Sequence, residues 1–240
     1  MTGLVRSEWC LAKEAMVIPT NWSQSGCVHI FPNYSPLRFL VADARNLIAE
    51  KAVMDKFEWL IFLDHDVLFP KDLLVKFNEY MLEEKVPIVG GLYFTKSVPA
   101  EPLIYRGRGN GYFRKWRLGE KVWVDGMGLG CHLISVKLLT RMYEEAEVYS
   151  LETGLKTRRI FHSPTGNITD PETGYELKFS GTEDLPWYDK VKNEGYFKKS
   201  GWKEYQGKQF PFLCDTTIFC QHINENGERF PSLGEEKKFK

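Results

Sequence analysis

Apolar and polar positions alternate along the first hundred residues in a pattern that predicts helices and strands in turn. Between residues 37 and 55, apolar side chains recur every three or four positions, which predicts an amphipathic helix. A short apolar run at 58–63 ends at charged residues, which is typical of a strand covered on both faces. A helix over 70–84 and an apolar run over 87–94 repeat the order. This alternation predicts a parallel sheet with crossover helices.

The pattern after residue 100 consists of short apolar pieces between glycine-rich turns. We expect strands at 103–105, 112–116 and 121–124, a helix over about 135–145, a helix over 184–193 ended by Gly195, and a last strand over 215–220. Turn signals at Thr153-Gly154 and Thr173-Gly174 predict an inserted hairpin region over 150–180. The chain therefore changes near residue 100 from helix–strand alternation to a β-rich half.

The two ends of the chain are less regular. A helix is expected over 4–17, followed by a proline-punctuated stretch with a short apolar piece at 27–31, and the tail over 231–240 is charged. We interpret the chain as one domain, with a first half over 1–100 and a second half over 101–230.

The composition is that of a globular protein with an ordinary mixed surface. Apolar residues make up 43% and aromatic residues 14% of the 240 residues, enough for a sizeable core. Lys plus Arg and Asp plus Glu each number 32, so the net charge is zero and no nucleic-acid partner is expected. The five cysteines show no CxxC spacing, and neither a signal peptide nor an apolar run long enough for a transmembrane segment is apparent. A cytoplasmic protein in a reducing compartment is the plain interpretation.

Two carboxylates separated by a single residue follow the apolar run at 58–63. Asp64 and Asp66 lie at the carboxyl end of a predicted strand, where open α/β sheets place their ligands. With no basic residue beside them, they would repel each other unless a cation lay between them, and Mg²⁺ and Mn²⁺ prefer such oxygen ligands. These ions usually bridge to phosphate oxygens, so we expect a phosphorylated or nucleotide substrate. A pair of solvated loop acids is the alternative, because a bare DxD pattern is common.

Four sequence motifs occur along the chain in an informative order. The first is Phe62-Leu63-Asp64-His65-Asp66-Val67, followed by Phe69-Pro70, with Ala44-Arg45-Asn46 in the helix before it. The others are the glycine-rich segment from Gly126 to Ile134, then Thr182-Glu183-Asp184, and last His222 after a predicted strand. In this order they resemble the DxD motif, the acceptor-side loop and the strand after it, the xED motif and the histidine that completes the metal site in GT-A glycosyltransferases similar to family 2.

The resemblance implies a GT-A (nucleotide-diphospho-sugar transferase-like) fold, with a Rossmann-like, mostly parallel central sheet flanked by helices and a smaller mixed β acceptor half. It implies that Asp66 binds the metal, that Asp64 contacts the metal or the ribose, and that His222 is a further ligand for Mn²⁺ or Mg²⁺. Arg45 would lie on the nucleotide side, or pair only within its own helix. The family opens with a strand, for which 16–18 is a short candidate.

A second set of residues is implied on the acceptor side. Asp184, or else Glu183, would be the base that deprotonates the acceptor hydroxyl, whereas the alternative is a pair of ordinary acids in the first turn of a helix. Trp187 could stack on a sugar ring or pack in the core. The loop residues expected to give backbone access beside the acceptor are Gly126, Met127 and Gly128.

The implied function is a metal-dependent transferase of the hexosyltransferase type. It would move a sugar from a UDP- or GDP-sugar to a hydroxyl-bearing acceptor such as a saccharide, with inversion if Asp184 is the base. One alternative is a haloacid-dehalogenase-like phosphatase, because Asp64-His65-Asp66-Val67 also fits its DxDx[TV] motif with Asp64 as nucleophile. Another is a non-catalytic module that binds a nucleotide-sugar or a carbohydrate.

Overall fold

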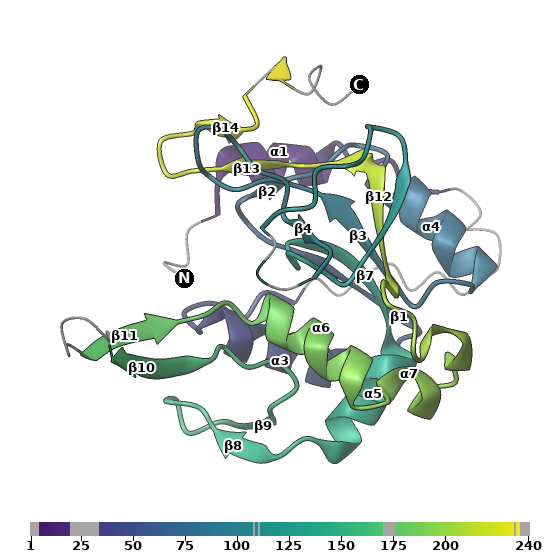
Figure 1. Cartoon of the computed structure of the whole chain (residues 1–240), viewed down its shortest axis with the longest axis vertical. Helices are drawn as coiled ribbons and strands as arrows, with labels where there is room; N and C mark the ends of the chain where they lie inside the picture. Colours follow the sequence, from purple (N-terminus) through teal and green to yellow (C-terminus); the bar gives the residue numbers. More distant parts are fainter. Residues whose placement is uncertain are drawn as a thin grey trace.

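The protein has a mixed α/β fold around a five-stranded sheet (Figure 1). The computed structural model describes residues 5–19, 34–107, 109, 111–169, 176–232 and 234–235, the side chains of 167–180 excepted. In spatial order, the central strands are β1 (Trp59–Leu63), β7 (Cys131–Ser135), β3 (Ile88–Leu92), β12 (Phe212–Phe219) and β5 (Lys121–Val124). Only β3 and β12 are parallel neighbours; the other three neighbouring pairs are antiparallel.

The expected mostly parallel sheet is therefore wrong, and β7 is the main reason. β1 and β3 run in the same direction, as the helix between them requires, but β7 lies between them and is antiparallel to both. Leu63 pairs with Cys131 on one side of β7, and Ile88 pairs with Ile134 on the other. A strand from the second half of the chain thus enters the first half, which local alternation of helices and strands cannot indicate.

Helices cover both faces of the sheet. The helical elements are α1 (Ser7–Glu14), α3 (Val41–Met54), α4 (Leu73–Glu83), α5 (Val136–Glu145), α6 (Asp184–Asn193), α7 (Tyr196–Lys199) and a 3₁₀ turn at Lys203–Tyr205. Figure 1 shows α4 on one side of the sheet and α3, α5, α6 and α7 together on the other. The predicted helices over 37–55, 70–84, 135–145 and 184–193 are present, but the first begins only at Val41 and the second at Leu73. Gly195 follows α6 with a φ of 78°, a conformation that glycine adopts without strain.

Two apolar layers result from the alternation of side chains along the central strands. Val89 and Leu133 belong to the layer under α4, with Phe77 of that helix. Their neighbours Ile88 and Ile134 belong to the opposite layer. Such strands are apolar on both faces, which explains their continuous apolar runs. β1, however, is an edge strand in which only Phe62 is fully buried, so the expectation of full cover holds for that strand only in part.

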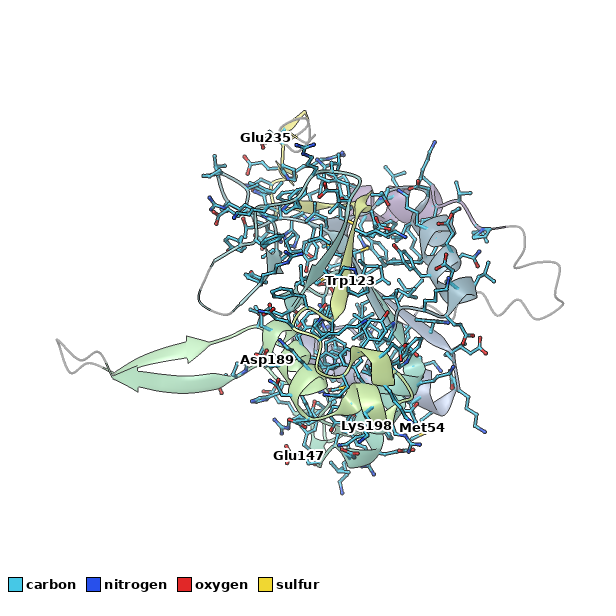
Figure 2. All side chains as sticks on the ribbon, turned by 45° about the vertical axis from the view of Figure 1, so that its right-hand side comes forward. Met54, Trp123, Glu147, Asp189, Lys198 and Glu235 are labelled. Carbon is cyan, nitrogen blue, oxygen red and sulfur yellow. The ribbon has the colours of Figure 1, made fainter. Side chains whose placement is uncertain are left out.

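Smaller sheets surround the central one. β2 (Val67–Leu68), β13 (Gln221–Ile223) and β14 (Arg229–Phe230) form a three-stranded sheet, and β4 (Ile104–Tyr105) pairs with β6 (Gly126–Met127). The predicted hairpin region contains two hairpins, β8 (Val148–Ser150) with β9 (Lys156–Arg158) and β10 (Thr165–Thr169) with β11 (Glu176–Ser180). The β10–β11 hairpin projects from the body of the molecule (Figure 2).

Some predicted elements have no counterpart. Residues 112–116 are not a strand, although Phe113 N–H donates to the Ile104 carbonyl at 2.8 Å, and residues 16–18 are not a strand either. The apolar piece at 27–31, the turn at 173–174 and most of the charged tail lie outside the described residues. Across the portion of the chain that the structure describes, no helix combines the length and the apolar character that crossing a membrane requires.

Candidate functional site

The DxD segment forms a turn directly after β1. Asp64 N–H donates to the Gly130 carbonyl at 2.8 Å, and the Asp64 carbonyl accepts from Val67 N–H at 3.1 Å. Because the extended strand ends at Leu63, the rule that alternate residues share a face does not apply to Asp64 and Asp66. The two carboxylates accordingly have different partners.

Arg45 joins two of the predicted motifs. It lies on α3 and is only 4% exposed. Its Nε donates to Glu183 Oε1 at 2.6 Å, and an Nη donates to Asp64 Oδ2 at 2.9 Å. The guanidinium also lies 5.0 Å from the centre of the Phe62 ring. Residues 45, 64 and 183 are distant in sequence, and this fork brings α3, the DxD turn and the start of α6 together.

Glu183 and Asp184 have opposite electrostatic states. Burial acts to raise the pKa of Glu183, but the charge of Arg45 and its hydrogen bond outweigh burial and hold the pKa below its ordinary value. The pKa of Asp184 lies well above its ordinary value, first because of burial and then because of the Glu183 charge. Asp184 Oδ1 is buried, and among the described residues it has no hydrogen-bond partner. Asp184 is thus a buried carboxyl group that holds its proton to higher pH than an ordinary aspartate does.

Asp66 faces a second group of residues. The short strands β2 and β13 pair Val67 with His222, and Ile223 N–H donates to the Asp66 carbonyl at 2.8 Å. This ladder places His222 Nε2 at 4.0 Å from Asp66 Oδ2. Lys96 Nζ lies 2.5 Å from the same oxygen. The predicted proximity of the DxD motif and His222 is therefore present, with an ammonium group as the partner of the carboxylate.

The tautomer of His222 follows from its other contact. His222 Nδ1 lies 2.6 Å from the Phe94 carbonyl oxygen, which can only accept, so Nδ1 carries the proton. Burial, opposed by the charge of Asp66, lowers the pKa of His222 and favours the neutral ring. In that ring Nε2 carries a lone pair toward the Asp66 carboxylate. A backbone carbonyl that fixes the tautomer in this way is the usual support of a metal-binding histidine.

The donor set fits a divalent ion held by two protein groups. Metal–ligand distances of about 2.1 Å place two ligands of one ion between about 3 and about 4 Å apart, which includes the Asp66–His222 separation. Within the described residues, no group of three or more His, Cys, Asp or Glu side chains is arranged to hold a metal. Asp64, expected as a third ligand, has Oδ2 paired with Arg45. An ion held by one carboxylate and one imidazole would take its remaining ligands from water and substrate phosphates.

Tyr93 lies between the Asp64 turn and His222, and the sequence did not indicate it as a site residue. Its hydroxyl oxygen accepts from Gly130 N–H at 2.8 Å, and its ring meets His222 edge-on at 5.0 Å between centres. A Cβ at Gly128 would lie 2.1 Å from that hydroxyl oxygen, so the loop requires glycine there. The glycine pattern of 126–130 was visible in the sequence, but nothing indicated that Tyr93 is the reason for it. Lys96 was also missed, because a lone lysine in a loop carries no signal.

Two predicted acceptor-side residues are buried. Trp187 is 1% exposed and stacks on Phe161, with ring centres 5.3 Å apart, so its core alternative fits and its face is not open to a sugar. Met127 is equally buried and belongs to the same apolar layer. The loop around Gly126 and Gly128 could therefore contact an acceptor only through its backbone.

A buried histidine lies behind the site. His132 of β7 is fully buried, and its Nε2 lies 2.6 Å from the Tyr188 hydroxyl. Burial, helped by the charge of Arg45, lowers its pKa to about 3, so the ring is neutral. His132 resembles a metal ligand neither in exposure nor in partners, and it is part of the buried layer between β7 and α6.

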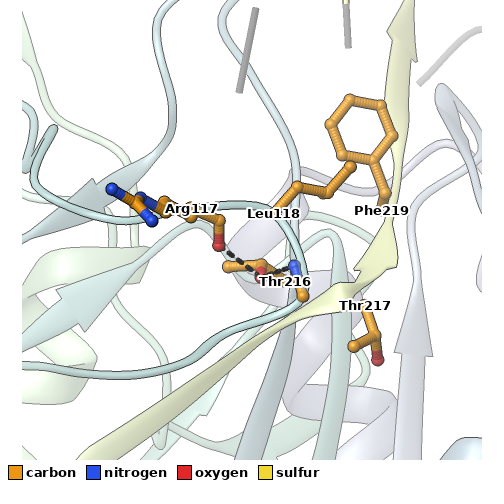
Figure 3. A pocket seen from close by; sticks show the side chains of 6 residues that line it. Arg117, Leu118, Thr216, Thr217 and Phe219 are labelled. Atoms are coloured by element: carbon orange, nitrogen blue, oxygen red, sulfur yellow. Dashed lines mark hydrogen bonds between the residues drawn. The ribbon is translucent and has the colours of Figure 1, made fainter. Parts of the chain in front are cut away.

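Two surface hollows lie away from these residues. Figure 3 shows the larger, of about 530 Å³, where the Thr216 hydroxyl accepts from Gly119 N–H and lies within hydrogen-bond reach of the Arg117 carbonyl. The smaller, of about 430 Å³, lies between α1 and the Phe69-Pro70 segment. None of the acids at 64, 66, 183 and 184 and neither Arg45 nor His222 lines them. The site is therefore defined by its chemistry and not by these hollows.

Comparison with known proteins gives a likeness of fold. No protein-family model matches the chain, and no curated protein does. The crystal structure of A197 from STIV, a viral protein, is similar with a TM-score of 0.51 and 17% identity. The match covers 94% of this chain and 83% of that chain. At this identity the likeness supports the mixed α/β fold and says nothing about activity.

Proposed function

We propose that the protein is a metal-dependent glycosyltransferase that moves a sugar from a nucleoside-diphosphate sugar to a hydroxyl acceptor. The observation that carries the proposal is the pair formed by Asp66 Oδ2 and His222 Nε2, two electron donors that face each other at 4.0 Å. Arg45 adds a link from the DxD turn to the helix that begins with Asp184. These contacts support the proposal, because they bring residues of the motifs that resemble those of GT-A enzymes together.

The residues have distinct tasks in this proposal. Asp66 and His222 would hold Mn²⁺ or Mg²⁺, and a metal bound there supplies Lewis acidity to the diphosphate leaving group. Asp184 accepts the proton of the acceptor hydroxyl, and its raised pKa makes its carboxylate a stronger base than an ordinary aspartate. Arg45 keeps Glu183 anionic and in place beside Asp184. Direct attack by the activated hydroxyl gives inversion at the sugar carbon.

The phosphatase alternative is less well supported by the contacts of Asp64. A phosphatase of that class would use Asp64 as the nucleophile. One of its oxygens is held by Arg45 at 2.9 Å, and the guanidinium draws electron density away from the attacking group. The geometry therefore favours a positioning role for Asp64.

A binding experiment tests the proposal. UDP, GDP and their sugars are titrated calorimetrically into the protein with Mn²⁺ and with EDTA. We expect binding only with Mn²⁺, and Asp66→Ala should abolish it. Asp55→Ala is the matched control, because Asp55 also pairs with a lysine but on the far end of α3. Unchanged Mn²⁺-dependent affinity in Asp66→Ala would contradict the metal assignment.

A second variant separates a transferase from a binding module. Asp184→Asn removes the proposed base and keeps the size and burial of the side chain. The transferase proposal expects lost turnover of the bound donor with unchanged UDP affinity. Equal donor hydrolysis or transfer by the variant and the wild type would remove Asp184 from the chemistry.

A further inference from the structure

Lys96 occupies the position beside Asp66 that a metal would need. Its Nζ lies 2.5 Å from Asp66 Oδ2, the same oxygen that faces His222 Nε2. A divalent ion bound to that oxygen and an ammonium group at hydrogen-bond distance from it would repel each other strongly. Metal binding at Asp66 therefore requires Lys96 to move away from the carboxylate. Breaking this ion pair costs free energy, and the sequence does not indicate the pair.

The surroundings of Lys96 allow this movement. The segment that follows β3 is closed at its base, because Thr95 N–H donates to the Glu101 carbonyl at 2.8 Å and Thr95 Oγ1 accepts from Glu101 N–H at 3.0 Å. The backbone next to Lys96 is thus fixed, whereas its side chain is 36% exposed and has four rotatable bonds. Rotation of the side chain alone can move the ammonium group away from Asp66.

We propose that a divalent ion displaces Lys96 from Asp66 and that the freed ammonium group then binds the diphosphate of the nucleotide. This inference rests on the proposed function. In the metal-free protein, Lys96 neutralises Asp66 and lowers the affinity for a bare ion. With metal and diphosphate present, the ammonium group exchanges the carboxylate for phosphate oxygens, which are equivalent partners for a lysine. Lys96 therefore couples ion binding to nucleotide binding.

The test measures Mn²⁺ binding by electron paramagnetic resonance and UDP binding by calorimetry in wild type, Lys96→Met and Lys96→Arg. Without nucleotide, Lys96→Met should bind Mn²⁺ on the order of tenfold more tightly, because the competing charge is gone. With saturating Mn²⁺, the same variant should bind UDP about tenfold more weakly. Lys96→Arg keeps the charge and should stay within about threefold of the wild type in Mn²⁺ affinity. Lys51→Met, which breaks a surface pair with Asp55, is the matched control.

The outcomes separate this inference from the function beneath it. If wild type binds Mn²⁺ and Lys96→Met binds it equally or more weakly, the displacement is overturned and the metal site stands. If Mn²⁺ binding tightens but UDP affinity is unchanged, the diphosphate role of Lys96 is overturned. If neither protein binds Mn²⁺ with or without UDP, both the inference and the metal-dependent function fail.

Discussion

Asp64 and Asp66 are two residues apart, yet their surroundings are of opposite kinds. Asp64 belongs to a closed network with Arg45 and Glu183, two residues whose side chains are almost fully buried. The two acids are similarly exposed, 31% for Asp64 and 25% for Asp66, but Asp66 faces Lys96, which is 36% exposed, and His222. One acid is committed to internal partners, and the other has partners that can exchange. A DxD pattern alone does not show this division.

The difference teaches which acid organises the site and which is available to a ligand. A buried arginine shared by two carboxylates fixes the relative positions of the elements that carry them, while its net contribution to stability is modest. An exposed lysine–carboxylate pair is worth little and is replaced at low cost. The Arg45 network therefore holds the acid–base residues, and the Asp66 pair is the part open to a cation.

The largest effect is expected from Arg45→Met. The substitution leaves Glu183 and Asp64 as buried or half-buried carboxylates without their cation, which typically costs about 3–5 kcal/mol of unfolding free energy. Urea unfolding at pH 7 measures it. Lys51→Met, at a surface pair, should cost less than about 1 kcal/mol. Equal losses in the two variants would remove the distinction between a closed network and an open pair.

The second-largest effect is expected from the buried His132, which should make the free energy of unfolding depend on pH. The folded-state pKa of His132 is about 3 and its ordinary value is 6.5, so the unfolded chain takes up the proton first as the pH falls. The stability that this group contributes is present above pH 6.5 and is lost as the pH falls toward 3. Between pH 7 and pH 4 the loss should be about 3 kcal/mol.

The variant His132→Leu isolates that contribution. It should unfold with a smaller free energy at pH 7, but its stability should fall less steeply below pH 6.5 than that of the wild type. Urea unfolding of both proteins at several pH values gives the difference curve. Parallel pH profiles for variant and wild type would show that His132 is not the group held neutral.

The smallest effect is expected at Asp184. Its raised pKa means that its contribution to stability is fully present below pH 3.8 and is lost as the pH rises through the folded-state value. Asp184→Asn stays neutral at all pH values, so it should match the wild type in acid and become the more stable of the two as the pH rises. Thermal unfolding from pH 4 to pH 9 measures this. A variant less stable than the wild type at high pH would mean that the carboxylate is better solvated than its burial indicates.

The sequence predicted the helices well because their apolar spacing is local. The amphipathic pattern over 37–55 and the proline that precedes α4 depend only on near neighbours, and both helices are present. The place of β7 between β1 and β3 depends on pairing between the two halves of the chain, which no local pattern contains. The error in sheet type follows from that one insertion.

The candidate site shows the same limit. The motifs gave Asp66 and His222 correctly as neighbours, because a resemblance carries spatial information that spacing does not. The partners Arg45 and Lys96 come from elsewhere in the chain. Arg45 pairs with Asp64 and Lys96 pairs with Asp66, so each positive charge reduces the repulsion between the two acids. Trp187 belongs to the core because α6 packs its aromatic face on Phe161, a contact set by tertiary packing.

The most direct test of the central claim is anomalous diffraction at the manganese edge from crystals grown with Mn²⁺ and UDP. The account predicts one strong peak about 2.1–2.3 Å from a carboxylate oxygen of Asp66 and from Nε2 of His222, with Lys96 moved off Asp66 onto the diphosphate. A peak elsewhere, or UDP bound with Lys96 still paired to Asp66 and no metal between that carboxylate and His222, would contradict it.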